Sequence, residues 1–185
     1  SPFFSNLTII LVFMLPLLTM RLFAEERRNK TDQLLLTAPV SVFGIVIGKF
    51  LSAAALFGFS LIITFVYPAV MLIYGNPLLS TVLALYCGFF LLGCSLISIG
   101  VFVSASTESQ ITAAIISFVI LLFIQLSDWV SSLFNNATVK KIFDWLSVTN
   151  RYQEFTDGVL SLSSVMFFIS FCAVFIFLTI SSIEK

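Results

Sequence analysis

Five long apolar runs dominate this 185-residue chain and leave few folds open to it. They are Leu7–Phe23, Val42–Tyr74, Leu79–Val103, Ile111–Val130 and Val165–Ile183. A bilayer core takes about 20 helical residues, and chains cross it as helices or closed barrels because every backbone polar group needs a partner there. The composition agrees, since 59% of the residues are hydrophobic, 10% are charged and the mean hydropathy is +1.13. The sequence predicts one all-α, polytopic transmembrane domain over residues 1–185, with five spans.

The second run is too long to cross a bilayer as a straight, upright helix. At 1.5 Å per residue, Val42–Tyr74 would make about 50 Å of helix against a core of about 30 Å. The run must therefore tilt, kink or continue along the interface, and Pro68 is the expected kink site. Pro16 interrupts the first run in the same way.

The connections between the runs also carry patterns. Apolar residues in 131–164 recur at helical spacing, which predicts short interfacial helices there. Thr107 with Gln110 matches a capping box and predicts a helix that opens after Thr107.

Lys and Arg are distributed unevenly, and this predicts an orientation. Arg21, Arg27, Arg28, Lys30, Lys49 and Lys185 fall on one side of the predicted membrane, and Lys140, Lys141 and Arg151 on the other. Basic loops stay in the cytoplasm, so residues 21–41 and the C-terminus are expected inside a bacterial plasma membrane. Ser1 then falls outside, and a helix upstream of it is expected. The net charge of zero gives no footprint for a nucleic-acid partner.

Catalytic and metal-binding signals are missing from the sequence. The chain has no His, which is the commonest metal ligand and general base, and no close Cys pair. The stretch GIVIGK (Gly44–Lys49) lacks the spacing and the Ser or Thr of a phosphate-binding loop, and Gly44 with Gly48 instead predicts close helix packing. We therefore expect no enzyme activity, metal or cofactor on this chain.

The loop 21–41 crowds charges between two apolar runs. Glu25 and Glu26 precede Arg28 and Lys30 at helical spacing, which predicts a short charged helix in which the Glu side chains pair with those bases or with backbone amides. LLLTAP (Leu34–Pro39) follows, and exposed leucines on such a loop suit the groove of a soluble partner. The simpler alternative is that the basic residues of this loop only set the orientation of the chain in the membrane and bind anionic lipid.

These residues resemble a known family. EERRNKTDQLLLTAPVS (Glu25–Ser41) followed by Gly48-Lys49 is similar to the signature of type-2 ABC transporter permeases, in the branch with the gliding-motility and nitrous-oxide-reductase-maturation permeases. Supporting stretches are NPLL (76–79), GFFLLGCSLISIGVFVS (88–104), TESQITAAIISF (107–118) and the terminal Glu-Lys.

The resemblance implies a six-helix permease of an ATP-driven exporter, of which the five spans would be helices two to six. Residues 21–41 would be the cytoplasmic coupling helix that contacts a separate cytosolic ATPase, and 131–164 an external re-entrant helical hairpin. ATP and Mg would bind the ATPase, and two permeases would pair as a homodimer or as a heterodimer with a related permease. The expected coupling residues are Glu25, Glu26, Arg27, Arg28, Thr31, Leu34, Leu35, Leu36, Thr37 and Pro39.

Two other functions remain open from the sequence. One is a transport-inactive membrane scaffold that recruits a cytosolic partner through the same loop. The other is an ion-coupled secondary carrier, which would use charged residues at mid-membrane. Asp128 is the candidate residue for such a carrier.

Overall fold

Every element in the described part of the chain is α-helical. The computed structural model describes residues 2–31, 41–74, 79–133, 148, 152, 155 and 161–184, and no strand occurs among them. The helices are α1 (Pro2–Thr19), α2 (Arg21–Arg28), α4 (Val42–Thr64), α5 (Val66–Tyr74), α6 (Leu79–Ser106), α7 (Gln110–Leu133) and α10 (Leu162–Ile183). The all-α prediction is confirmed.

The sequence predicted five spans, and the described residues contain four or five helical stretches suited to crossing a membrane. Four stretches are long and apolar enough, and a fifth, in α7, is apolar but shorter. The four are Leu7–Arg28, Val42–Val70, Ser80–Ser106 and Leu162–Ile183, and the fifth is Gln110–Leu126. Large apolar side chains also cover the outside: Phe59, Ile62, Ile111 and Phe177 are each more than 60% exposed. Such a surface is stable against lipid tails and not against water.

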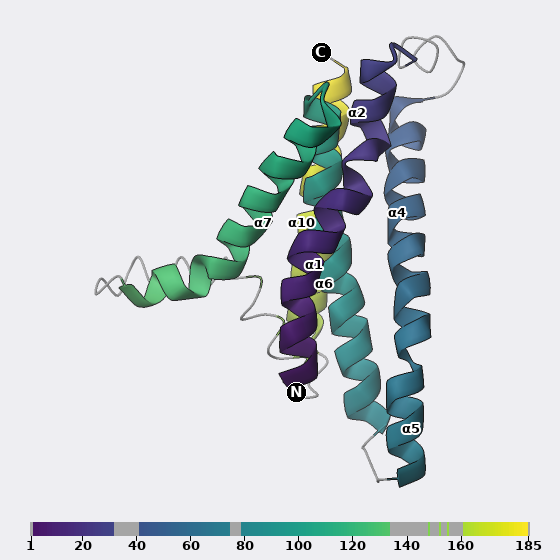
Figure 1. The fold of residues 1–185 in the computed structure, drawn as a ribbon, viewed down its shortest axis with the longest axis vertical. Coiled ribbons are helices and arrows are strands. Elements are labelled where there is room, and N and C mark those ends of the chain that lie inside the picture. Colours follow the sequence, from purple (N-terminus) through teal and green to yellow (C-terminus); the bar gives the residue numbers. More distant parts are fainter. Residues whose placement is uncertain are drawn as a thin grey trace.

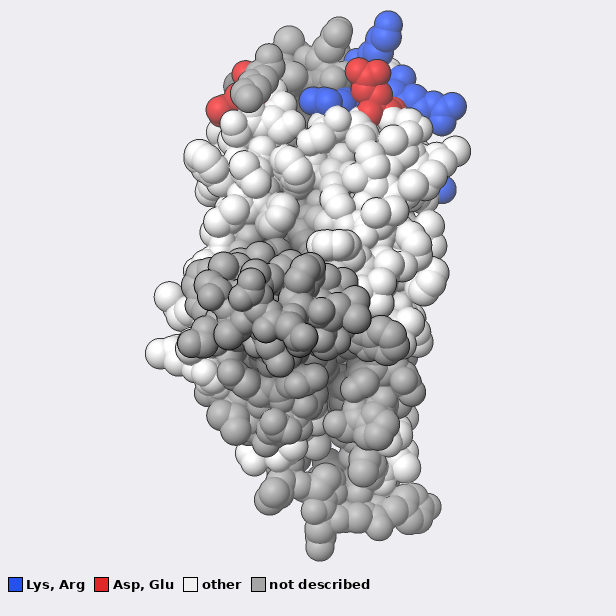
Figure 2. Space-filling model, turned by 90° about the vertical axis from the view of Figure 1, so that its left-hand side faces the viewer, with Lys and Arg blue, Asp and Glu red and all other residues white. Residues whose placement is uncertain are grey.

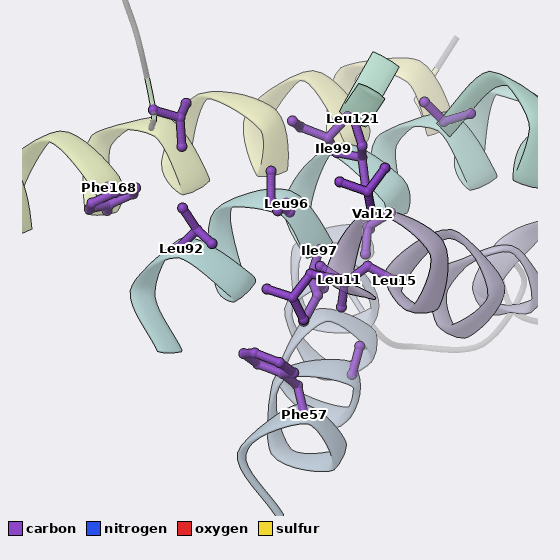
Figure 3. Packing of buried hydrophobic residues seen from close by; sticks show 14 of the residues in the cluster. Leu11, Val12, Leu15, Phe57, Leu92, Leu96, Ile97, Ile99, Leu121 and Phe168 are labelled. Atoms are coloured by element: carbon purple, nitrogen blue, oxygen red, sulfur yellow. The ribbon is translucent and has the colours of Figure 1, made fainter. Parts of the chain in front are cut away.

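Helix α6 is the centre of the bundle. It packs against α1, α2, α4, α7 and α10, which surround it in Figure 1. The buried side chains in Figure 3 come from α6 and these neighbours, with Ile97 and Leu96 of α6 between Leu15 of α1, Phe57 of α4 and Phe168 of α10. Helix α7 leans away from the other helices along its length (Figure 1).

Glycines on α6 let its neighbours approach closely. A Cβ built on Gly93 would lie 2.0 Å from Phe57 Cε1, and one on Gly100 would lie 2.2 Å from Thr19 Oγ1. Small residues at such contacts are typical of membrane helix packing, where close van der Waals contact drives association. The sequence pattern had singled out Gly44 and Gly48 instead. A Cβ on Gly48 would meet no heavy atom within 4 Å, so close packing at that position needs a second chain.

The long second run breaks one turn before Pro68, as the sequence predicts. Helix α4 ends at Thr64 and α5 begins at Val66. Proline has no N–H, so Pro68 cannot donate to the carbonyl of Thr64 four residues earlier. The hydroxyl of Tyr86, on α6, donates to that carbonyl over 3.0 Å. A side chain from the central helix thus replaces the missing backbone donor.

The predicted capping box at Thr107 is wrong. Helix α7 begins at Gln110, and the amide of Ala113 donates to the carbonyl of Ser109 over 2.9 Å. The hydroxyl of Thr107 instead donates to the carbonyl of Val103 over 2.9 Å, at the end of α6. Thr107 therefore satisfies the end of one helix rather than the start of the next.

The described residues of 131–164 support the helical prediction for that segment. Val148, Tyr152 and Phe155 are helical and buried at spacings of four and three residues. The ring of Phe155 lies against Gly88 of α6 and 6.1 Å from the ring of Phe168 of α10. The expected re-entrant hairpin itself lies outside the described residues.

Candidate functional site

The described charged side chains gather at one end of the bundle. Figure 2 shows blue and red atoms at this end, and almost all of the described surface below it on the visible face is white. The charged residues are Arg21, Glu25, Glu26, Arg27, Arg28, Lys30, Lys49, Glu108 and Glu184. Helix α2, the start of α4 and the C-terminal end of α10 meet there (Figure 1). We call this region the charged end.

The start of α2 is held by a residue far away in the sequence. Met20 precedes α2 and gives it no side-chain cap. The buried Ser104 Oγ, on α6, accepts hydrogen bonds from the amides of Phe23 and Ala24 over 3.1 and 3.2 Å. It also donates to the carbonyl of Met20 over 3.1 Å. Ser104 therefore acts as the N-terminal cap of α2 from another helix and uses all three hydrogen-bonding positions of its hydroxyl.

The end of α2 closes in a tight C-terminal motif. The amide of Lys30 donates to the carbonyl of Arg27 and the amide of Thr31 to that of Glu26, over 3.1 and 3.0 Å. This is the Schellman pattern, in which one residue takes a left-handed conformation. Lys30 has that conformation, with φ of 55°. The chain thus turns sharply out of α2 and toward residues 32–40.

Lys49 connects α2 to α4. Its Nζ lies 2.5 Å from Glu26 Oε2, and it also donates to the carbonyl oxygen of Leu22. The same ammonium lies 4.3 Å from the ring centroid of Phe23, a cation–π contact. The pair is partly shielded, because the Lys49 and Glu26 side chains are 18% and 32% exposed. Glu26 was expected to pair with Arg28, Lys30 or backbone amides, and the structure gives it Lys49.

No contact at the charged end was predicted for Ser104 or Lys49. Ser104 was only one letter of an apolar stretch, and its bonds to Phe23 and Ala24 join residues about 80 positions apart in the chain. Lys49 was used for the orientation, for the phosphate-loop test and as part of the family signature, and no partner was predicted for it. A lone Lys inside the first turns of an apolar helix calls for a nearby partner.

The predicted coupling residues divide into two groups. Glu25, Arg28 and Thr31 are exposed on or just after α2, and Glu26 and Arg27 are partly exposed there. Leu34, Leu35, Leu36, Thr37 and Pro39 lie outside the described residues, as does the side chain of Asp128 in α7. Beyond this gap, Ser41 caps the start of α4 by accepting from the amide of Gly44 over 3.2 Å.

In the described part of the chain, no cluster of three or more His, Cys, Asp or Glu residues could hold a metal ion. Cys87, Cys94 and Cys172 are free thiols. Ser95 Oγ lies 3.6 Å from Cys172 Sγ and 3.4 Å from the carbonyl of Phe168, so this contact joins α6 to α10. The described part of the molecule thus concentrates its polar chemistry at the charged end.

Apolar helices around a central helix, with charges gathered at one end, define a multi-pass membrane protein. A family profile described as "ABC-2 family transporter protein" matches residues 3–183, and the chain belongs to this family. A search of curated proteins gave no match. The protein is a membrane permease of an ABC transporter, and permeases of this family usually work with an ATPase subunit.

Proposed function

We propose that this permease couples ATP hydrolysis by a separate cytosolic ATPase to the export of a substrate across a bacterial plasma membrane. The observation that carries the proposal is the arrangement of α2. Both of its ends are closed by specific hydrogen bonds, and it is tied to α6 by Ser104 and to α4 by Lys49. A helix held in this way can pass on a force applied next to it.

The segment 32–40 is where we place the contact with the ATPase. In the sequence it follows the Schellman turn at Lys30 and precedes the cap at Ser41. Leu34, Leu35 and Leu36, with Thr37 and Pro39, supply the docking side chains, and Arg27 and Arg28 lie on α2 beside it. ATP and Mg bind the ATPase, and closure of two ATPase subunits presses on this segment. This assignment places the charged end in the cytoplasm.

The transporter works as a dimer of permeases, either identical or related, with Leu7–Phe23 and α7 at the interface. Both elements expose large side chains in the described structure, among them Phe13 at 57% and Phe123 at 59%. We assign the chain to the branch with the gliding-motility and nitrous-oxide-reductase-maturation permeases, and the loop motif Glu25–Ser41 supports this assignment.

The docking role of the leucines is tested by charge substitution. Burial of a leucine in a partner's groove is worth roughly 1.5–3 kcal/mol, whereas an exposed ion pair is worth about 0–1 kcal/mol. Leu35→Asp should therefore release the co-purifying ATPase or abolish its stimulated ATP hydrolysis, and Arg27→Gln should have a mild effect. Membrane insertion of both variants is checked by membrane fractionation.

Two outcomes would contradict the proposal. Full ATPase association and transport in both Leu34→Asp and Leu35→Asp would show that the loop is a topology signal and not a docking site. Stable association with no stimulated hydrolysis under any condition would support a scaffold in place of a transporter.

A further inference from the structure

One charged side chain makes the polar contacts that the structure describes between α2 and α4. In the part of the chain that the structure describes, α2 packs along α6, and comparably close packing does not extend from α2 to α4. Lys49 bridges the two helices by reaching Glu26 and the carbonyl oxygen of Leu22. This ammonium group therefore adds a direct tie between α2 and α4 to the packing of both helices on α6.

The junction between α1 and α2 makes this bridge important. The helical run is interrupted at Met20, and the hydroxyl of Ser104 satisfies the backbone groups around the interruption. A junction bridged by a side chain bends more readily than a continuous helix, whose geometry is fixed by its own backbone bonds. Packing on α6 and the bonds to Ser104 hold the start of α2, so a pivot at Met20 would chiefly displace its far end, where Glu26 lies.

Lys49 supplies the restraint at the right place. It lies on α4, seven residues after the first residue of that helix, and α4 follows segment 32–40 in the sequence. Its partner Glu26 lies on α2, the helix that precedes segment 32–40. The side chain of Lys49 is 18% exposed, so water screens the contact with Glu26 less than it screens a surface ion pair. The ring of Phe23 also limits where the ammonium can move.

We propose that Lys49 is a positioning residue that latches α2 to α4, so that displacement of segment 32–40 moves α4 instead of being absorbed by pivoting of α2 at Met20. This inference rests on the proposed function for the source of the displacement. The latch itself is a property of the permease alone and can be measured without the ATPase.

The first experiment measures the latch in the full chain reconstituted in lipid nanodiscs. The three native cysteines are replaced by alanine, and spin labels are placed at Asn29→Cys and Phe43→Cys, both exposed sites. Lys49→Met, which keeps the apolar stem, should lengthen and broaden the distance distribution between the labels, and Glu26→Gln should do the same. Lys49→Arg should preserve the distribution, and the double variant Glu26→Gln/Lys49→Met should be no broader than Lys49→Met alone. Glu108→Gln, an exposed carboxylate in the α6–α7 connection at the same end, is the control.

The second experiment measures the response of α4 to nucleotide. Labels at Phe43→Cys and Glu184→Cys report α4 against the end of α10 in the complex with the co-purifying ATPase. Trapping with ATP and vanadate should shift this distance in the permease that keeps Lys49 and in the Lys49→Arg variant. Lys49→Met should lose most of the shift while trapping the same amount of nucleotide.

The results of these experiments test three separate claims: the latch, its role in coupling and the proposed function. An unchanged Asn29–Phe43 distribution in both Lys49→Met and Glu26→Gln would overturn the latch. A broadened distribution with a full vanadate-induced shift would overturn its role in coupling. Failure of the unmodified permease to bind any ATPase would overturn the proposed function and the coupling role with it, and the first experiment would still report on the latch.

Discussion

Ser104 Oγ lies 3.1 Å from the amide nitrogen of Phe23, so a serine near the end of α6 caps the start of α2. Near the other end of α6, Tyr86 donates to the carbonyl of Thr64 at the α4–α5 break. Tyr86 and Ser104 are eighteen positions apart, or about 27 Å along a helix. The central helix thus carries a hydroxyl at each of the two breaks of its neighbours.

Removal of the Ser104 hydroxyl should destabilise the protein clearly. Ser104→Ala leaves two amides and a carbonyl at the α1–α2 junction without their partner, and each buried unsatisfied group costs about 1–3 kcal/mol. Unfolding in mixed micelles titrated with a denaturing detergent should show a loss at least as large as the cost of one such group, about 1–3 kcal/mol. Ser106→Ala, two residues away and exposed, should change the free energy of unfolding by less than about 0.5 kcal/mol. Equal losses in the two variants would rule out the capping role.

Tyr86→Phe should also destabilise, and more than Thr64→Val does. The first variant removes the donor to the Thr64 carbonyl, which Pro68 cannot replace, at a cost of about 1–3 kcal/mol. The second removes the Thr64 hydroxyl, which donates to the carbonyl of Leu61 and lies 3.5 Å from the Tyr86 hydroxyl, and it leaves the bond from Tyr86 to the Thr64 carbonyl in place. The same unfolding measurement compares them. A larger effect of Thr64→Val would mean that the break does not depend on Tyr86.

Two glycines should respond in opposite ways to alanine. Gly93→Ala places a methyl group against the ring of Phe57, and overpacking of this kind costs about 1–3 kcal/mol. Gly48→Ala meets open space and should raise monomer stability by about 0.5–1 kcal/mol, because alanine favours the helix. If Gly48 packs against a second permease, the same change should also weaken the dimer. Sedimentation in detergent measures that, and an unchanged dimer would exclude Gly48 from the interface.

Lys30→Gly should stabilise the end of α2. An L-residue with positive φ costs roughly 1–2 kcal/mol in the left-handed region, and glycine avoids this cost. Hydrogen exchange of the amides at positions 30 and 31 should slow about fivefold for each 1 kcal/mol gained. Asn29→Gly, at φ of −85°, should give no such protection. Faster exchange in Lys30→Gly would show that the lysine side chain, and not the turn, holds this end.

Single cysteines test the orientation. With native cysteines removed, Asn29→Cys and Asn135→Cys should react with a membrane-impermeant maleimide from opposite sides of the membrane. Asn29 is expected to react from the cytoplasm because basic residues favour that side. Labelling of both positions from one side would overturn the count of spans between them.

The sequence predicted the elements better than it predicted their contacts. Length and hydropathy are local properties, so the long apolar helices and the break before Pro68 could be anticipated. The central place of α6 could not, because its hydropathy resembles that of the other helices. Its buried Ser95, Ser98 and Ser104, together with its glycines, were the available signal.

At the charged end, too, the helix was predicted and its contact with another helix was not. A charged helix after the first run was predicted, and α2 confirms it. The partner of Glu26 was predicted within four residues along the same helix, for example Lys30. In the structure Glu26 pairs with Lys49 instead. An ion pair between two helices depends on how their axes approach each other, which spacing along one helix cannot give.

The serines of α6 also bear on how the protein is made in the membrane. Ser95 Oγ lies 3.4 Å from the carbonyl of Phe168 and is fully buried. Phe168 belongs to α10, the last described helix to be synthesised, so a nascent chain that ends before Leu162 leaves this face of α6 without its cover. Before α10 arrives, the Ser95 hydroxyl can bond only the carbonyl of Leu91 within α6, so synthesis of the last described helix completes the polar contacts of this face.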